Sequence, residues 1–260
     1  MENTKINKSA ARVMDILVLL SEKDEPLTIS QIGRELEMPK SSTFELLNTM
    51  VERGFLETNP QLKTYKLGLR LFEVGAAYLF NTDLHKEARP YLESLMVRTG
   101  ETAFLAIESS GEIVYLDKME APSSVRTTAT LGTRSPMHTT GLGKAMLAAY
   151  PDAKVRELIG GKEFVQRTPK SIGNMEDLLA ELEATRKRGY SIDDEENELD
   201  IFCLAVPVFD ASDRPAAAMS VAGLLRRMTD SRIEVCANYL TEAALDVSRR
   251  LGYRHDRLFP

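Results

Sequence analysis

The chain has 260 residues, of which 43% are hydrophobic, and it carries a formal net charge of -6. This length suits one large domain or two of ordinary size, and the apolar content allows each to bury a core, so we expect two domains. The acidic balance argues against a protein coated with basic residues for nonspecific nucleic-acid binding. Residues 1–80 contain 10 Lys+Arg and 11 Asp+Glu, so any contact with DNA in this segment must come from a local arrangement of side chains.

The sequence contains no signal for a membrane or a metal. No run approaches the roughly 18 to 20 apolar residues of a membrane span, and the start MENTKINKSAARVM lacks the apolar centre of a secretory signal. We therefore expect a soluble cytoplasmic protein with no membrane partner. The two cysteines, Cys203 and Cys236, and the three histidines form neither a CxxC pair nor an HExxH motif. We expect reduced thiols, no metal site and no cofactor.

The first predicted element is a helix that begins with Ser9 as its N-cap and ends near Glu22. Its apolar positions recur at helical spacing, at Val13, Ile16, Leu17 and Leu20. A polar turn follows, and then Thr28 and Gln31 form a capping-box pattern that opens a short second helix, ISQIGREL.

A third helix is predicted from about Pro39 to Arg53, with Gly54 as its C-cap, because Met38-Pro39 ends the helix before it. After Gly54 the period changes to two, and FLET and TYKL are predicted as short strands around the turn NPQLK. Three helices with a tight turn before the third, followed by a hairpin, predict a winged helix-turn-helix.

The face of the third helix opposite its apolar stripe carries short hydrogen-bonding groups, which suit phosphate oxygens and base edges in a major groove. The candidate DNA-binding residues are Lys40, Ser41, Ser42, Phe44, Glu45, Asn48 and Thr49, with Lys63 in the hairpin turn. The alternative is that Phe44 packs against the wing or the first helix and Glu45 pairs with Lys40 or Arg53. Units of this kind also serve as plain scaffolds or protein-docking modules.

Six motifs resemble the IclR family of bacterial regulators over residues 9 to 252. They are PLTISQIGRELEMPKSSTFELLNTMVERGFLE, YKLGLRLFEVG, ARPYLESLMVRTGETAFLAI, IVYLDKME, MHTTGLGKAMLAAYP and RKRGYSIDDEENELDIFCLAVPVFD. The resemblance implies an α/β (α+β) chain with a winged helix-turn-helix over residues 1–68, a linker helix over 69–82, and a GAF-like effector-binding and oligomerisation domain over 83–260. Phe44 and Glu45 stand where many members have a His-Arg pair, so the operator of a relative cannot be carried over.

Residues 83–260 taken alone alternate helix-like and strand-like segments, which indicates an α/β or α+β layer structure. A helix ending at Gly100 precedes a hairpin of TAFLAIES and EIVYLDKM around the turn SSGE. GLGKAMLAAY and MEDLLAELEATRKRG are predicted helices, the second ending at Gly189. FCLAVPVFD and PAAAMSVAG are predicted buried strands, and the last helix is expected to open with a capping box from Ser231 to Glu234.

The helix after Thr140 is the candidate effector site, because free backbone N–H groups at Gly141 and Leu142 and the missing side chain of Gly141 would let an anion approach. The resemblance places Asp193, Cys203 and Ser220 around the same cavity, whereas Ala222 occupies a family position that can be serine. We expect a carboxylate-bearing metabolite, with Asp193 favouring a donor group on the same ligand. The alternatives are that the glycines shape a turn and that Cys203 and Ser220 are ordinary core residues.

Catalysis has little support in the sequence. His138 with Cys203 could act as base and nucleophile, and Lys118 or Lys144 as an amine catalyst, but no third orienting residue accompanies them. We therefore predict a ligand-responsive transcriptional repressor that is not an enzyme. It would bind double-stranded, palindromic operator DNA as a homodimer or homotetramer. A ligand-binding or docking module without specific DNA binding is the alternative.

Overall fold

The computed structural model describes residues 7–80, 83–121 and 129–259, and the chain divides into two compact units, residues 1–81 and 82–260. The described residues do not include residues 1–6, which belong to the start of the chain discussed above. They also do not include residues 81 and 82, at the end of the predicted linker. None of the described helices is long and apolar enough to cross a membrane.

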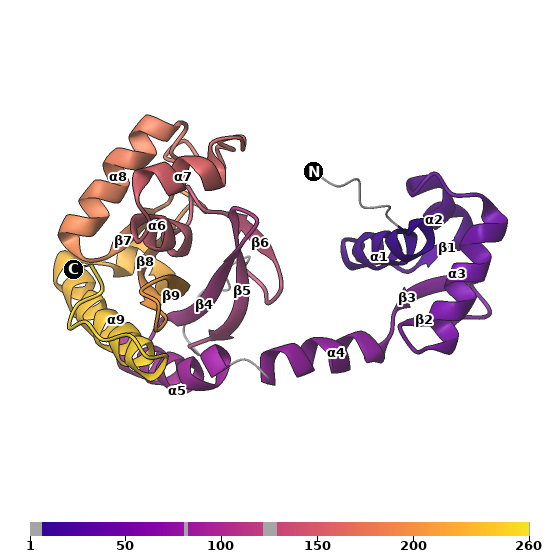
Figure 1. Cartoon of the computed structure of the whole chain (residues 1–260), viewed down its shortest axis with the longest axis horizontal. Helices are drawn as coiled ribbons and strands as arrows, with labels where there is room; N and C mark the ends of the chain where they lie inside the picture. The colour runs from indigo at the N-terminus through magenta and orange to yellow at the C-terminus, as the bar shows by residue number, and fades with distance from the viewer. Residues whose placement is uncertain (1–6, 81–82, 122–128, 260) are drawn as a thin grey trace. The chain divides into compact units, whose positions relative to one another are not determined.

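The first unit contains α1 (Lys8–Ser21), β1 (Leu27–Thr28), α2 (Ile29–Glu35), α3 (Lys40–Glu52), β2 (Leu56–Asn59), β3 (Thr64–Leu67) and α4 (Leu69–Phe80) (Figure 1). The three strands pair antiparallel in the order β1-β3-β2. The helices pack on one another through a small core that includes Ile16, Leu20, Ile32, Leu47 and Met50. This arrangement confirms the predicted winged helix-turn-helix.

The starts of the first two helices show one wrong prediction and one confirmed prediction. Asn7, not Ser9, caps α1, because the Asn7 side chain accepts hydrogen bonds from the N–H groups of Ser9 and Ala10. The capping box of α2 is present: Gln31 Oε1 accepts from Thr28 N at 2.7 Å, and Thr28 Oγ1 accepts from Gln31 N at 3.4 Å.

The second unit begins with α5 (Asp83–Thr99), β4 (Thr102–Ser109), β5 (Glu112–Met119) and β6 (Arg134–Pro136), followed by the helices α6 (Gly141–Ala148), α7 (Asp152–Ile159) and α8 (Met175–Arg188). It ends with β7 (Ser191–Asp194), β8 (Ile201–Phe209), β9 (Pro215–Leu224), a short 3-10 turn and α9 (Asp230–Arg250). The strands form one antiparallel sheet in the order β6-β5-β4-β9-β8-β7.

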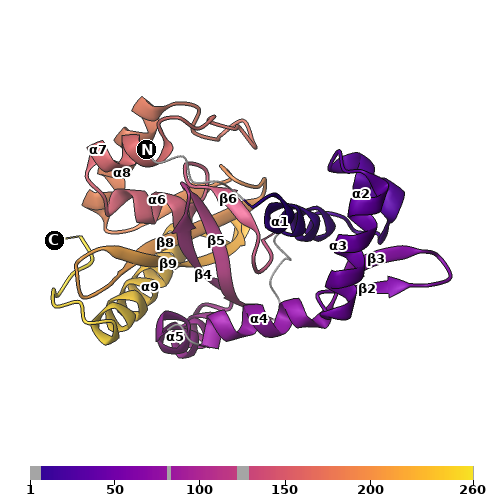
Figure 2. The same ribbon diagram turned by 45° about the vertical axis from the view of Figure 1, so that its right-hand side comes forward.

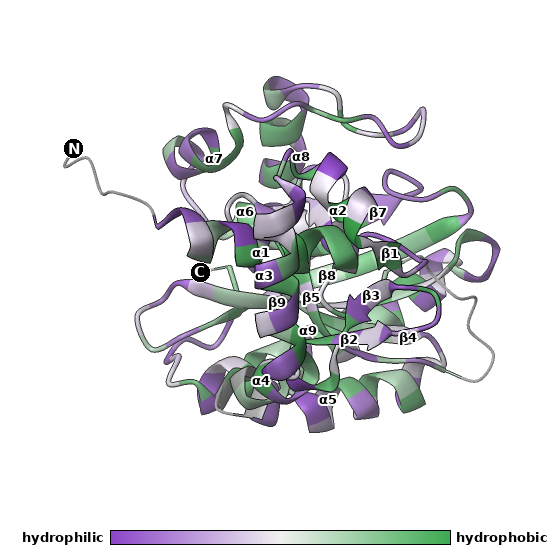
Figure 3. Cartoon of the chain, turned by 90° about the vertical axis from the view of Figure 1, so that its right-hand side faces the viewer, coloured by the Kyte–Doolittle hydropathy of each residue, from purple (hydrophilic) through white to green (hydrophobic). Residues whose placement is uncertain are grey.

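Helices cover both faces of this sheet. α6 packs on one face with α8 behind it, and α5 and α9 pack on the other (Figures 1 and 2). All nine residues of β8 are buried because both of its faces are covered. Green and purple alternate along α5 in Figure 3, as expected for a helix with one face toward a core. The α/β class is confirmed.

For the later helices, one predicted helix end is confirmed and one predicted helix start is wrong. α8 ends where predicted, with Gly189 in the left-handed region at φ 89°. α9 begins one residue before the predicted capping box, with Thr229 as N-cap and no side-chain capping hydrogen bond, so the capping box at Ser231 was a wrong prediction. Four short elements of the structure were not predicted from the sequence: β1, β6, β7 and α7.

Candidate functional site

The outward face of α3 is one candidate site. Lys40, Ser41, Phe44, Glu45, Asn48 and Thr49 are exposed, and Ser42 is half-buried. The opposite face buries Thr43, Leu47 and Met50. The predicted polar face is therefore available to a partner, because the core uses the other side of the helix.

The two residues that depart from the family pattern lie on the exposed side of α3. The Phe44 side chain is 51% exposed, so the ring is not packed into the core of the unit. Glu45 has no ion pair among the described residues, and its backbone carbonyl accepts a hydrogen bond from Thr49 Oγ1 at 2.9 Å. Both side chains are therefore accessible to a partner.

The hairpin of β2 and β3 presents a second exposed element of this unit. Asn59 Oδ1 accepts hydrogen bonds from the N–H groups of Gln61 and Leu62 at 3.0 and 3.1 Å, which fixes the turn. Lys63 is exposed at the tip with φ 54°. Lys66 is paired with Glu57 at 3.0 Å, whereas Lys63 has no ion pair in the described part of the chain and can face a phosphate.

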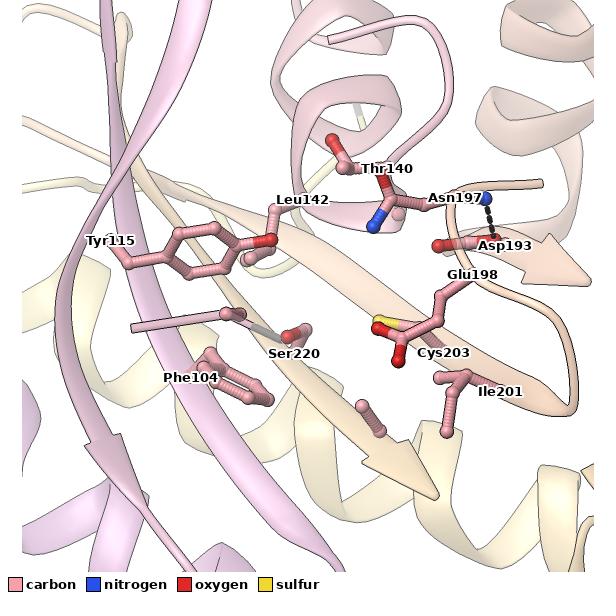
Figure 4. Close-up of a pocket in the computed structure, with 13 residues that line it drawn as sticks. Phe104, Tyr115, Thr140, Leu142, Asp193, Asn197, Glu198, Ile201, Cys203 and Ser220 are labelled. Carbon is pink, nitrogen blue, oxygen red and sulfur yellow. Dashed lines mark hydrogen bonds between the residues drawn. The ribbon is translucent and has the colours of Figure 1, made fainter. Parts of the chain in front are cut away.

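The second candidate site is a cavity that lies against the sheet at the start of α6 (Figure 4). All six residues predicted for the effector site line it: Thr140, Gly141, Leu142, Asp193, Cys203 and Ser220. The cavity is also lined by Ala222 and by six residues that were not predicted from the sequence: Phe104, Tyr115, Ala129, Asn197, Glu198 and Ile201.

Strand register explains why residues distant in sequence share this wall. Phe104 on β4 lies opposite Ser220 on β9, and Cys203 on β8 lies opposite Ala222. Residues that pair directly across antiparallel strands project on the same face. The Phe104 and Tyr115 rings meet edge to face with centroids 5.6 Å apart. Tyr115, an aromatic residue with a polar tip inside an apolar strand, was a signal that the sequence analysis could have used.

The start of α6 separates the roles of its two glycines. Thr140 Oγ1 accepts a hydrogen bond from Gly143 N at 3.1 Å, which caps the helix, and the N–H groups of Gly141 and Leu142 have no partner within the helix. A Cβ at Gly141 would meet Cys203 Sγ at 3.1 Å, on the cavity side, whereas a Cβ at Gly143 would lie 2.3 Å from Met137 Cα. Gly143 therefore permits packing, and Gly141 keeps the cavity open.

Asp193 is buried with one oxygen occupied. Its Oδ1 accepts hydrogen bonds from Glu196 N at 2.8 Å and Asn197 N at 3.2 Å, and its other oxygen points into the cavity (Figure 4). Burial raises the pKa of Asp193 to about 7, against the opposing effect of the Lys144 charge and the two backbone N–H groups. Near neutral pH this side chain can therefore be present as a carboxylic acid.

Three other polar groups of the cavity, those of Cys203, Tyr115 and Ser220, are neutral and buried. Burial raises the pKa of the Cys203 thiol and of Tyr115 to about 12 each, so neither is ionised near neutral pH. The Ser220 hydroxyl, beside the Cys203 thiol, has no well-formed hydrogen-bond partner among the described residues. A buried hydroxyl without a partner is costly, so a ligand atom that bonds to it would relieve that cost.

The residues considered for catalysis do not assemble. His138 Nε2 lies 3.2 Å from the carbonyl of Val165, and its ring contacts Phe164 with centroids 4.7 Å apart. His138 lines a different cavity from Cys203. Lys118 pairs with Glu120 at 2.8 Å. Among the described residues there is also no group of three His, Cys, Asp or Glu placed to hold a metal ion.

Comparison with known proteins covers both units. Residues 9–60 match the IclR helix-turn-helix domain, and residues 76–249 match the bacterial transcriptional regulator IclR C-terminal domain. The chain is 34% identical over 248 residues to the HTH-type transcriptional regulator XynR of Escherichia coli K12, covering 95% of this chain and 98% of XynR. It is also 34% identical to the HTH-type transcriptional repressor AllR of the same strain, over 94% of this chain and 90% of AllR.

Solved structures give the same result. The Thermotoga maritima IclR structure aligns with a TM-score of 0.79 at 33% identity, covering 94% of this chain and 99% of that one. An IclR homologue of Microbacterium hydrocarbonoxydans, crystallised with 4-hydroxybenzoate, aligns with a TM-score of 0.81 at 27% identity, covering 94% and 99%. The chain therefore belongs to the IclR family of bacterial transcriptional regulators, with an N-terminal DNA-binding helix-turn-helix and a C-terminal effector-binding domain.

Proposed function

We propose that this regulator is a repressor that binds a palindromic operator through α3 and the wing, and that it senses a small carboxylate-bearing metabolite in the α6 cavity. Like the other transcriptional regulators of its family, it is not an enzyme. The main support for the sensing role is the cavity, which is lined by the start of α6 and by the Ser220 hydroxyl, a group without a well-formed hydrogen bond among the described residues. Because its target is bacterial DNA, we place the protein in the cytoplasm.

The DNA-binding residues of this proposal are Lys40, Ser41, Ser42, Phe44, Glu45, Asn48, Thr49 and Lys63. Their exposure supports the assignment, since base and phosphate contacts need side chains that the core does not use. The similar protein AllR is a transcriptional repressor, which supports the proposal that this regulator represses transcription.

The carboxylate class follows from the chemistry of the cavity wall. No Lys or Arg is among the described residues that line it, so the positive end of α6, with the N–H groups of Gly141 and Leu142, is the feature that attracts an anion. The co-crystallised 4-hydroxybenzoate of the Microbacterium homologue, an aromatic carboxylate, supports the same class. The Phe104 and Tyr115 rings offer an apolar wall for the rest of such a ligand.

A homodimer or homotetramer is part of the proposal. α1 exposes Met14 and Val18, which lie about one helical turn apart, and α4 exposes Leu69 and Phe72, which also share a helix face. Apolar residues that recur on one helix face in an otherwise polar surface favour association. A symmetric dimer would present two copies of α3 to two half-sites of an inverted repeat.

Two binding experiments test this function. Footprinting on the intergenic DNA beside the gene should show discrete protection of an inverted repeat. Diffuse, sequence-independent protection, or no binding, would instead favour a docking module.

The second experiment titrates the same protein–DNA complex with small carboxylates, including 4-hydroxybenzoate. Asp193→Ala and Ser220→Ala should lose or change the response while they bind the operator normally, because α3 and the cavity lie in different units.

A further inference from the structure

A buried ion pair lies beside the effector cavity, in a place that ordinary helix electrostatics disfavours. The Lys144 side chain is fully buried and donates a hydrogen bond to Glu196 Oε1, and the Glu196 side chain is only 13% exposed. Lys144 is the fourth residue of α6, so its ammonium lies near the positive end of a helix dipole. Burying it there is unfavourable unless nearby negative charge compensates.

The carboxylates around Lys144 outnumber the cation. Glu196 Oε1 is paired with Lys144, while Glu196 Oε2 is buried without a hydrogen-bond partner in the described part of the chain. Asp193 is 5% exposed, and the charges of Lys144 and Glu196 both act on its pKa, Lys144 lowering it and Glu196 raising it. One ammonium and two ionised carboxylates would leave a buried net negative charge, which is strongly unfavourable.

The other groups that face Asp193 do not compensate the excess negative charge. Tyr115 and the Cys203 thiol are neutral, as described above. Glu198, which lines the same cavity, is acidic. Arg167 is exposed and donates to Asn197 Oδ1 at 3.2 Å, so solvent screens its charge. A proton in the cluster is the simplest neutralisation, and Asp193 is the place for it because the cation contacts Glu196.

We propose that Asp193 carries a proton on the oxygen that faces the cavity, that the Glu196 charge favours this proton against the opposing charge of Lys144, and that the anionic effector binds together with it. Since Asp193 Oδ1 already accepts two backbone hydrogen bonds, the free oxygen is the one that can hold the proton. The carboxylic acid then donates to an oxygen of the effector, beside the N–H groups of Gly141 and Leu142.

This inference rests on the proposed function, and it narrows the class of ligand. From the sequence, we expected Asp193 to favour a hydrogen-bond donor group on the effector. A protonated Asp193 instead favours an acceptor, such as a carboxylate or keto oxygen, at this point of the cavity. An ionised effector would be repelled by an ionised Asp193 at the same place. The effector and the proton are therefore bound or released together.

The first test needs no effector. The chain is labelled with carbon-13 at the aspartate carboxyl carbons, and the Asp193 signal is assigned by its loss in Asp193→Asn. We expect a titration midpoint close to 7, whereas a midpoint near the ordinary aspartate value of about 4 would overturn the proposal. Glu196→Gln should lower the midpoint because it removes a negative charge, and Lys144→Met should raise it because it removes a positive one.

Glu196→Gln keeps the shape of its side chain, so it provides the test if Lys144→Met does not fold. An unchanged Asp193 midpoint in Glu196→Gln would contradict the proposed effect of the Glu196 charge on this proton. A loss of packing alone would have no reason to shift the midpoints of the two variants in opposite directions.

The second test uses acetate as the probe on the full chain. Acetate affinity should fall about tenfold per pH unit above the Asp193 midpoint, because one proton is bound with the anion. Asp193→Asn is the matched control: its amide donates without titrating, so its acetate affinity should not change with pH over this range. A wild-type affinity independent of pH, or no response of the Asp193 signal to acetate at about pH 6, would overturn the coupling. Either result would leave operator binding and the effector response, measured separately, untouched.

Discussion

Alanine at position 143 should destabilise the C-terminal unit, whereas alanine at position 141 should leave its stability nearly unchanged. A Cβ at Gly143 would lie 2.3 Å from Met137 Cα and 2.4 Å from the Met137 carbonyl oxygen. Carbon atoms pack best at about 3.5 to 4.0 Å, so the backbone would have to move by more than about 1 Å. Overpacking of this kind costs about 1 to 3 kcal/mol, and alanine's higher helix propensity would return at most about 1 kcal/mol.

The contacts at Gly141 lead to the opposite expectation. The nearest atom to an added Cβ is a side-chain atom, Cys203 Sγ at 3.1 Å, followed by Ala205 Cβ at 3.5 Å. A shift of a few tenths of an ångström relieves that contact, and the gain in helix propensity offsets the remaining cost. The added methyl group does enter the cavity, so Gly141→Ala should weaken the effector response.

Hydrogen exchange measures this difference within the second unit, where a single unfolding free energy for a two-unit chain would not be well defined. Amides of α6 and β8 should exchange faster in Gly143→Ala and at wild-type rates in Gly141→Ala. The amides of α1 and α3 are the internal control and should be unaffected by either change. Equal protection of α6 in the two variants would refute the assignment of separate roles to the two glycines.

Three further predictions concern DNA and pH. Glu45→Gln should change the preferred base at one symmetric pair of operator positions, with a change of about 1 to 3 kcal/mol in the discrimination between bases there. If the wild type and the variant select identical consensus sites from random DNA, Glu45 reads no base. Operator affinity should fall with salt less steeply than for a strongly basic protein, because few cations face the phosphates; a slope as steep as theirs would contradict this. Asp193 has a higher pKa folded, about 7, than its ordinary value of 3.8, so it lowers stability as pH rises from about 4 to 7. Asp193→Asn should therefore raise the thermal midpoint of the second unit more above pH 7 than near pH 4, and a pH-independent difference would count against the raised pKa.

The sequence predicted features that depend on local patterns. The capping box of Thr28 and Gln31, the exposed polar face of α3 and the end of α8 at Gly189 are each set by residues within a few positions of one another. The cavity residues were found differently, since the resemblance supplied Asp193, Cys203 and Ser220, and strand register then showed that Cys203 and Ser220 face the same space as Phe104 and Ala222.

Features that depend on distant partners were missed. Lys144 was considered only as an amine catalyst, because its burial depends on Glu196, 52 residues further along the chain. Phe104 and Tyr115 lie in strands whose faces are both largely buried, so apolar periodicity does not show which side chains line a cavity. Asn7 was overlooked because Ser9, two residues later, is also a good capping residue, and propensity alone does not choose between them.

One measurement tests most directly the claim that the α6 cavity controls operator binding from a separate unit. Operator DNA is titrated with wild type and with Gly141→Leu, each with and without the carboxylate that changes wild-type binding, and fluorescence anisotropy follows the complex. The bulkier side chain would extend toward Cys203 and Asp193 and fill the cavity. We predict equal operator affinity for the two proteins without the effector and a response in the wild type alone. An equal response in both proteins would contradict the account, because the effector would then bind elsewhere.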